Sequence, residues 1–388
     1  MEQSDILIAG GGMVGAASAL ALADLGLEVT LFEAQEPKLF DSEQPMDLRV
    51  SAISQASERL LENLGGWTGV ASMRSAPYRT LETWEWQGAR ICFDAGELGL
   101  SHLGHIVENR ILQLSLWQAV RRHSRVRLMT GIRPERFWQD DQGAWLEADG
   151  RFYRGQLLLG CDGAQSQVRR QAGIGVSGWN YRQHCLAINI RTERPQQDGT
   201  WQEFTPTGPR ALLPLAGPHA SLVWYDAPET IARLKRLPIG ELKRAILSAF
   251  PDRLGQFEIE QLASFPLTRQ HAKAYYQGRV VLLGDAAHTI NPLAGQGVNL
   301  GFKDVAALAE VVRQGMEQGE PIYSDAVLKR YQRRRHPDNL AMQTAMDAFY
   351  LMFSNDHLPL KLARNLGLTL AEHSGPIKRK VMQYAMGL

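Results

Sequence analysis

The chain begins with a glycine-rich turn of the kind that holds a phosphate group. The turn, GGGMVG, follows the apolar run at residues 6–9 and precedes an alanine- and leucine-rich stretch that ends at Gly26. A strand, a turn and a helix in this order place free backbone amides and the positive end of the helix dipole where they stabilise an anion. In such a turn Gly10 permits the tight bend, Gly12 lets the backbone approach a pyrophosphate, and Gly15 lets the helix pack closely on the strand.

An acid at the end of the next predicted strand extends this site. Glu33 follows the apolar residues 27–32 and stands 21 positions after Gly12, where a carboxylate can accept hydrogen bonds from an adenosine ribose. The strand, turn, helix and acid therefore predict a dinucleotide site. This pattern does not distinguish FAD from NAD.

A second entrance of the same kind lies near the other end of the chain. Residues 278–285, GRVVLLGD, read as a buried strand that ends in Asp285, and residues 295–301, GQGVNLG, read as the start of a long helix. Amides exposed at such a helix start stabilise the negative charge of a bound group. The alternative is a glycine-rich helix start that only packs against the core.

A third segment combines an apolar strand with an acid. Residues 157–170, LLLGCDGAQSQVRR, place Asp162 directly after the predicted strand. Asp162 could also cap the helix that follows, since a carboxylate satisfies the free amides at a helix start.

Together these three segments resemble the single-component flavin-dependent aromatic hydroxylases. That family carries a GD motif followed by a proline and a glycine-rich helix start, and a DG motif of the form GxDGxxSxVR, in which Cys161 here replaces the more usual alanine. The resemblance implies that the cofactor is FAD, with its ADP half at the first turn and its flavin half at the second. It also implies that Asp285 holds a ribityl hydroxyl and that Asp162 and Arg169 serve FAD and the pyridine nucleotide.

The same resemblance identifies the residues nearest the flavin ring. It implies that Pro292, Gly295 and Gly297 lie beside the ring and that the surrounding backbone faces its pyrimidine end, including Gln296, Val298 and Asn299.

Two further segments fit the family pattern. Arg49, in DLRVSAIS, is a candidate flavin contact, with an ordinary surface arginine as the alternative. Asn109 and Gln113, in GHIVENRILQLSLW, are candidate ring contacts, with a plain amphipathic helix as the alternative.

Other catalytic patterns are missing from the sequence. It contains no CxxC pair, no G-x-S-x-G turn and no histidine and carboxylate spacing that we interpret as a metal site. The cofactor must then carry the chemistry. The family resemblance implies that NAD(P)H reduces the flavin, that O2 adds at C4a, and that the hydroperoxide transfers a hydroxyl group to an electron-rich ring. We assign no catalytic base among the four histidines considered, His184, His219, His271 and His288.

Longer likenesses narrow the resemblance to the hydroxylases of ubiquinone biosynthesis, and within them to those that act on a demethoxyubiquinol. They include YRTLETWEW, WQEFTPTGPRALLPL, SLVWYD and FPLTRQHA. They imply a polyprenyl quinol substrate and leave open contacts with other proteins of that pathway. Hydroxylation at another ring position or of another phenol is an alternative, as is a non-catalytic FAD-binding protein.

Composition excludes several other classes. Lys and Arg number 42 against 41 Asp and Glu, so no positive field exists to hold nucleic acid. The three cysteines are scattered, which argues against a disulfide framework. No basic leader precedes the first apolar run and no apolar stretch is long enough to span a membrane. We therefore expect a cytoplasmic protein.

These residues require an α/β fold in which a Rossmann-like FAD-binding domain is interleaved with a β-sheet domain for the substrate. The glycine- and proline-punctuated middle of the chain alternates apolar and polar residues, which favours half-buried strands. We expect a sheet over the flavin ring. The predicted ranges are 1–73, 105–175 and 268–335 for the FAD domain, 74–104 and 176–267 for the substrate domain, and 336–388 for carboxyl-terminal helices.

The last part of the chain, residues 361–388, holds five basic residues and one acid. Leu362, Leu366 and Leu370 would line one face of a helix. The segment could contact an anionic membrane or a partner protein, or it could pack on the FAD domain, which we favour slightly.

Overall fold

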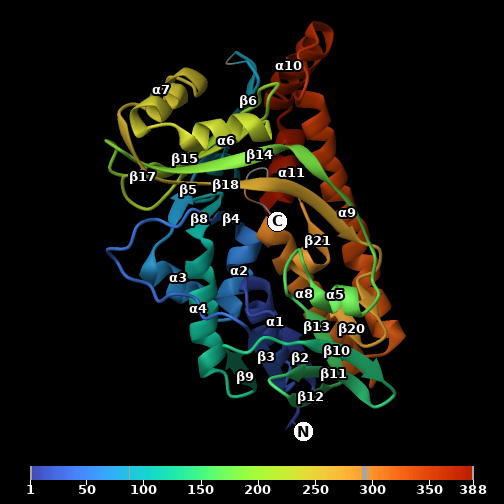
Figure 1. The fold of residues 1–388 in the computed structure, drawn as a ribbon. Helices are drawn as coiled ribbons and strands as arrows, with labels where there is room; N and C mark the ends of the chain where they lie inside the picture. The colour runs from blue at the N-terminus through green and yellow to red at the C-terminus, as the bar shows by residue number, and fades with distance from the viewer. Residues whose placement is uncertain (1, 87, 291–294, 296, 387–388) are drawn as a thin grey trace.

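The computed structural model describes residues 2–86, 88–290, 295 and 297–386. Figure 1 shows a Rossmann-like part below, an open sheet above, and helices from the end of the chain along one side. The chain passes between the two parts several times, which confirms the predicted interleaved α/β fold.

A six-stranded sheet forms the Rossmann-like part. Five of its strands are parallel, and the edge strand β19 is antiparallel. The strands at residues 6–9, 157–160 and 280–282 are buried on both faces, as continuous apolar runs require. In spatial order they are β19 (Tyr276–Gln277), β20 (Val280–Leu282), β13 (Leu157–Gly160), β2 (Ile6–Ala9), β3 (Val29–Glu33) and β9 (Val126–Thr130).

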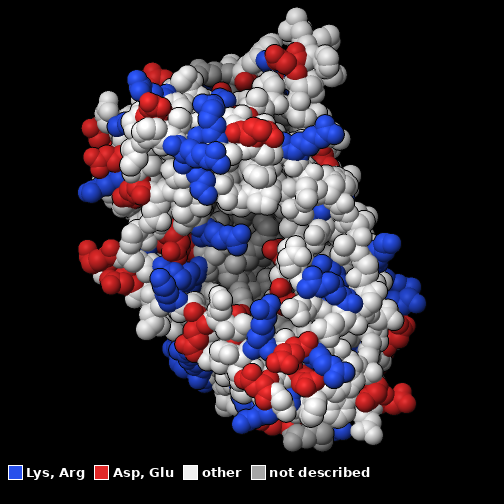
Figure 2. Space-filling view, viewed as in Figure 1, with Lys and Arg blue, Asp and Glu red and all other residues white. Residues whose placement is uncertain are grey.

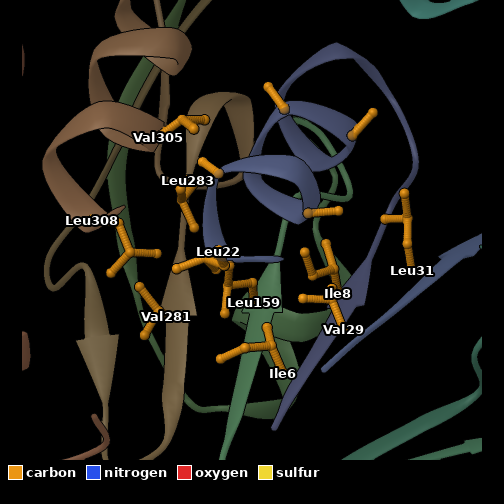
Figure 3. Close-up of a cluster of buried hydrophobic side chains, with 14 of the residues drawn as sticks. Ile6, Ile8, Leu22, Val29, Leu31, Leu159, Val281, Leu283, Val305 and Leu308 are labelled. Atoms are coloured by element: carbon orange, nitrogen blue, oxygen red, sulfur yellow. The ribbon is translucent and has the colours of Figure 1, made fainter. Parts of the chain in front are cut away.

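Two helices pack together over the core of this sheet. Helix α1 (Met13–Ala23) and helix α8 (Gly297–Glu317) contact each other, and Figure 3 shows their apolar side chains above those of the strands. The labelled side chains are Ile6, Ile8, Leu22, Val29, Leu31, Leu159, Val281, Leu283, Val305 and Leu308. This packing brings the amino ends of both helices to the same side of the sheet, at the carboxyl ends of its parallel strands.

An eight-stranded sheet lies above, with α6 (Pro228–Arg236) and α7 (Ile239–Ala249) on its outer face (Figure 1). The outer face packs into its own apolar cluster, which includes Leu222, Trp224 and Ile246. In spatial order the strands are β21 (His288–Thr289), β18 (Phe257–Ala272), β14 (Val176–Thr192), β17 (His219–Asp226), β16 (Arg210–Pro214), β15 (Gly199–Glu203), β6 (Thr80–Trp84) and β7 (Arg90–Asp94).

Smaller elements connect and flank these layers. A three-stranded sheet, β4 (Val50–Ser54), β8 (Gly104–Glu108) and β5 (Ala76–Tyr78), lies between the two large sheets, with a four-stranded sheet at the far end. The latter contains β1 (Glu2–Gln3), β12 (Arg151–Gly155), β11 (Gly143–Ala148) and β10 (Arg136–Asp140). The remaining helices before α8 are α2 (Gln55–Asn63), α3 (Trp67–Met73), α4 (Asn109–Arg122) and α5 (Gln167–Gln171), with short 3-10 turns η1 (Ala95–Leu98) and η2 (Gly284–Ala286).

The chain ends in three helices, α9 (Asp325–Phe353), α10 (Leu358–Glu372) and α11 (Pro376–Met386). Helix α10 contacts β7, so α10 packs on the eight-stranded sheet and not on the FAD domain, which we slightly favoured for the segment. Met382 of α11, in contrast, is buried in a cluster with Met46 and Ala52, which lie in the range predicted for the FAD domain. The amide of Cys92 donates to Glu372 at 2.8 Å, and the amide of Trp86 donates to Asn365 at 3.1 Å. Among the described residues, no helix has the length and apolar character needed to cross a membrane.

Candidate active site

The first turn has no room for side chains where the glycine pattern predicted close packing. A Cβ on Gly15 would lie 1.9 Å from the carbonyl oxygen of Gly10. Gly10 has a φ of 101°, and its Cβ would lie 2.4 Å from the carbonyl oxygen of Cys161. In contrast, a Cβ on Gly12 would meet nothing within 4 Å. Gly12 therefore leaves an open approach to the amino end of α1, which has no side-chain cap.

Polar contacts hold this turn from behind. Glu33 accepts from the amide of Gly11 at 2.7 Å through one oxygen and from the amide of Gln35 at 3.0 Å through the other. Gln113 and Trp117 both donate to the carbonyl of Gly11, at 3.0 and 2.7 Å. The side chain of Gln113, a candidate ring contact with a plain amphipathic helix as the alternative, thus contacts the phosphate turn. Sequence patterns had not identified Trp117, whose role depends on the packing of α4 against α1.

The second turn reaches the same place from the other side. Val14 of α1 fits between two glycines, since a Cβ on Gly301 or on Gly284 would lie 2.5 or 3.1 Å from its methyl carbon. Gly284 also has a φ of 58°, which disfavours any other residue. This contact joins the two glycine-rich turns into one surface.

The side chain of Asp285 faces the cavity between the two turns. It is therefore accessible to a ligand in the cavity, although protein surrounds the cavity. Burial raises the pKa of the Asp285 carboxyl, and the nearby His288 and Arg49 partly oppose that rise. An acid in such a position gains from any ligand hydroxyl that can donate to it.

The third motif ties these elements together. One oxygen of Asp162 accepts from the amides of Gln167 and Val168 at 2.7 and 3.1 Å, so Asp162 does help to cap α5. Its other oxygen, Oδ1, is buried and has no hydrogen-bond partner among the described residues. Arg169 is buried and donates to the carbonyls of Ala286 and Ala164 at 2.7 and 3.0 Å. Arg169 therefore holds the GD segment in place, and its buried guanidinium is not exposed to a pyridine nucleotide.

Arg49 and Asn109 both line the cavity. The side-chain oxygen of Asn109 accepts from the hydroxyl of Ser51 at 2.7 Å, and the backbone N–H of Asn109 donates to the carbonyl of Arg49 at 3.0 Å. Arg49 is exposed to the cavity, with its guanidinium 6.0 Å from the ring centroid of Phe265. These contacts place both candidates on one wall.

The helix start at α8 forms the next part of the wall, with Gly295, Gly297 and Val298 among the lining residues. Asn299 is buried behind them. Its side chain accepts from the amide of Ser54 at 3.1 Å and donates to the carbonyl of Ala52 at 2.8 Å, so it anchors β4 to α8. Of the predicted ring-adjacent residues, Pro292 and Gln296 lie outside the described residues.

One continuous cavity of about 480 Å³ contains these groups. Figure 2 shows a hollow between the upper and lower parts of the molecule. Its upper wall is the inner face of the eight-stranded sheet, because lining residues alternate along the strands with residues of the outer apolar cluster. The inner-face lining residues are Cys185, Ala187, Ala211, Leu213, Ser221, Val223, Tyr225, Phe265 and Leu267.

A buried polar network supports the second turn from behind. Asp304 accepts from the amide of Gly284 at 3.0 Å, from Nε of Arg335 at 2.7 Å and from the amide group of Asn339 at 3.1 Å. His288 Nε2 lies 2.5 Å from the same carboxylate and must donate, because an ionised carboxylate only accepts. Burial raises the pKa of Asp304, but His288 and Arg335 outweigh it and hold the pKa below its usual range.

The four histidines that we considered do not form a catalytic pair. His288 belongs to the network, and His219 pairs with Glu260 at 3.0 Å. Burial lowers the pKa of His271 to about 4, with His336 and His288 adding to the effect.

The residues fit FAD on three observations. The open approach at Gly12 suits a pyrophosphate, the carboxylate of Asp285 offers an acceptor at the cavity wall, and a single cavity extends from Gly12 to Gly297.

The family model described as FAD binding domain matches residues 3–346. The 3-demethoxyubiquinol 3-hydroxylase of Escherichia coli is 50% identical over 388 residues, which cover 100% of this chain and 99% of that protein. The ubiquinone hydroxylase UbiL of Rhodospirillum rubrum is 35% identical, with 99% of this chain and 90% of that protein covered. Among solved structures, the p-nitrophenol 4-monooxygenase PnpA of Pseudomonas putida superposes with a TM-score of 0.79 at 18% identity, covering 100% of this chain and 99% of that one, and shares its fold.

Proposed function

Because the chain belongs to the FAD-dependent hydroxylases of ubiquinone biosynthesis, we propose that it hydroxylates the free ring position of a demethoxyubiquinol, a polyprenyl benzoquinol. The observation that carries this proposal is the single cavity, in which three strand-to-helix turns face the apolar inner side of a sheet. A flavin on the turns would meet an aromatic ring held by the sheet.

The overall reaction balances with O2 and NAD(P)H as co-substrates. One oxygen atom of O2 is inserted between a ring carbon and its hydrogen to give a hydroxyl group, and the other leaves as water with the hydride of NAD(P)H, which carries two electrons, and one proton from solvent. Bound FAD supplies the electron transfer and the oxygen activation, which no side chain of the protein can supply.

The side chains provide binding, orientation and exclusion of water. The amides at the start of α8 would stabilise negative charge on the pyrimidine end of the flavin, and Asp285 would hold its ribityl chain. The positive charge of Arg49 would partly balance the negative charge of the Asp285 carboxylate. The apolar sheet face would keep water from the reacting edge.

Ser221 is the residue of the sheet best suited to orient the quinol. Its hydroxyl is buried, has no hydrogen-bond partner among the described residues, and belongs to a side chain that lines the cavity. A hydroxyl of the substrate would satisfy it.

We also propose the division into FAD domain, substrate domain and terminal helices at the boundaries expected from the sequence.

Two other functions make different predictions. A hydroxylase of another ring position, or of another phenol, would consume O2 without converting the demethoxy compound. A non-catalytic FAD-binding protein would oxidise no NAD(P)H in response to quinol. The 50% identity over the full chain favours the proposed reaction over both.

We expect the purified FAD-loaded protein to convert a short-chain demethoxyubiquinol into a product that carries one more oxygen atom. Mass spectrometry would identify the product while O2 and NAD(P)H consumption are followed. Dithionite reduction of the flavin, followed by O2 and quinol, tests the hydroxylation without the natural reductant. Flavin reoxidation without hydroxylated product in both experiments would contradict the proposal.

We further propose that helix α10 makes a peripheral contact with the membrane that holds the prenyl chain. Leu362, Leu366 and Leu370 are 52, 60 and 63% exposed and recur every four residues, so they share one helix face. The basic residues of this segment contribute less to attraction toward an anionic membrane than their number suggests. Arg364 pairs with Glu85 and Lys378 pairs with Glu97, so both charges are neutralised within the protein.

Replacing Leu362, Leu366 and Leu370 together by Ser should weaken binding to vesicles of mixed neutral and anionic lipid by at least about tenfold, since insertion of each leucine removes apolar area from water. Cosedimentation measures the binding. A matched variant with Ile239 and Leu247 replaced by Ser, both also exposed, should bind as the parent does. Equal binding of the triple variant and the parent would exclude α10 as the contact, and vesicle binding that is absent in all three would exclude the membrane.

A further inference from the structure

Glu58, His102 and His105 converge on one point, away from the cavity described above. Glu58 lies on α2, His105 on β8, and His102 just before β8 (Figure 1). Oε2 of Glu58 lies 3.0 Å from Nε2 of His102 and 3.2 Å from Nδ1 of His105. Potential ligand atoms of the three residues all lie within 4.8 Å of one another, and none of the three residues lines the cavity.

These separations suit a bound transition metal. With metal-to-ligand distances near 2.0–2.2 Å, two ligand atoms lie about 3.3 Å apart in a tetrahedral site and about 2.9 Å apart in an octahedral one. The two distances to Glu58 fall in this range. The side chains are 12 to 21% exposed, so the point is enclosed by protein but open to one side, where water could complete the coordination.

Neighbouring groups hold the two histidines in position. The hydroxyl of Ser101 lies 2.8 Å from Nδ1 of His102, and Gln55 donates to the carbonyl of His102 at 2.7 Å. Trp67 packs edge-on to the ring of His105 at 5.0 Å. Outer contacts of this kind orient ligand rings in metal sites.

The potential ligand atoms lie close together without a complete set of hydrogen bonds. Nδ1 of His105 is buried, lies 3.2 Å from Oε2 of Glu58, and makes no hydrogen bond of acceptable geometry among the described residues. The rings of His102 and His105 stand 4.4 Å apart, centroid to centroid, beside this one carboxylate. A divalent cation would bind all three ligand atoms at once.

We propose that Glu58, His102 and His105 form a binding site for a divalent transition metal ion, with zinc as the ion that this set of two nitrogens and one oxygen fits best. His102 and His105 have the spacing H-x-x-H, which we did not interpret as a metal site from the sequence because Glu58 is distant along the chain. The metal would connect α2 to β8. Because Ser54 caps α2 and its amide donates to Asn299 of α8, the site would brace the cavity wall that carries Ser51.

The test uses tag-free, FAD-loaded protein that has been treated with chelator and desalted. Titration with ZnCl2 in a calorimeter gives affinity and stoichiometry, and elemental analysis after gel filtration gives the zinc retained. Co2+ provides a spectroscopic check, since four-coordinate Co2+ absorbs at longer wavelengths than the flavin. We expect one zinc ion per chain. His102→Gln, His105→Gln and Glu58→Gln should each weaken binding by at least about tenfold.

His219→Gln is the matched control, because His219 also faces a glutamate, Glu260, at 3.0 Å but without a second histidine. It should bind zinc as the parent does. Flavin content and circular dichroism show whether each variant is folded, and His102→Gln, at the more exposed ligand, tests the site if His105→Gln fails to fold. Parent protein that retains no zinc, or ligand variants that bind zinc as tightly as the parent, would overturn the proposal.

Discussion

Replacement of Asp304 by Ala is expected to destabilise the protein by about 3 to 5 kcal/mol, because it removes the fully buried carboxylate that pairs with Nε of Arg335 and leaves this buried guanidinium only the partly exposed carboxylate of Asp338. The amide of Gly284 and the ring of His288 lose an acceptor in the same step. The second glycine-rich turn should therefore loosen, and FAD affinity should fall together with stability. Urea unfolding monitored by circular dichroism, with flavin content measured in parallel, checks both effects.

Two controls separate the network from a general loss of charge. Asp356→Ala removes an exposed carboxylate paired with Lys361 at 2.7 Å and should change stability by less than about 1 kcal/mol. Adding Arg335→Leu to Asp304→Ala also removes the buried guanidinium. The double variant should therefore lose less stability than the two single variants lose when their losses are added. Additive losses would mean that Arg335 does not depend on Asp304.

The difference in free energy of unfolding between the parent and Asp304→Ala should depend on pH with a definite sign. The pKa of Asp304 is held below its ordinary value of 3.8, so its folded form binds fewer protons than the unfolded chain in acid. Its contribution is complete above that value and is lost as the pH falls through the lower, folded pKa. The stability gap between the parent and Asp304→Ala should thus narrow in acid, below about pH 4.

The sequence predicted the three strand-to-helix turns well because each is encoded locally. Apolar residues at 6–9, 157–160 and 280–282 became neighbouring parallel strands, and each preceded a glycine or acid that the turn requires. Alternation along strands such as β17 likewise indicated a sheet with two different faces. Period and turn chemistry are sufficient for such elements, since both act within a few residues.

Contacts between distant residues could not be predicted in the same way. Asp304 ends the segment GFKD of the second entrance, yet its partner Arg335 is 31 residues away and only the packing of α9 on α8 brings them together. The cluster of Glu58 with His102 likewise depends on how α2 lies against the strand β8 region. Gln113 was one candidate ring contact, and the sequence predicted its helix but not which side of that helix faces the first turn, where Gln113 donates to the carbonyl of Gly11.

Gly297→Val should reduce hydroxylation by at least about a hundredfold while the protein keeps its fold. A Cβ on Gly297 would have Ile290 as its nearest neighbour, at 4.0 Å, so the protein itself leaves room for a side chain. That room belongs to the cavity, at the amino end of α8. The valine methyl groups would displace the flavin ring from the amides that stabilise its negative charge, and loss of such a donor typically costs two to three orders of magnitude. Product formation and flavin content measure the effect.

Gly295 and Gly240 make this prediction specific. Gly295 has a φ of 66° and its Cβ would lie 3.0 Å from the amide nitrogen of Ala52, so Gly295→Val should also lower stability, whereas Gly297→Val should not. Gly240 occupies the first turn of α7, and its Cβ would meet nothing within 4 Å, so Gly240→Val should keep nearly parental activity. If flavin-loaded Gly297→Val hydroxylates the quinol at the parental rate, the start of α8 does not lie under the reacting ring. The open space at Gly297 predicts that Gly297→Val is folded, binds flavin and is inactive. If Gly297→Val instead loses stability together with activity, the loss of activity is explained by unfolding and the prediction is wrong.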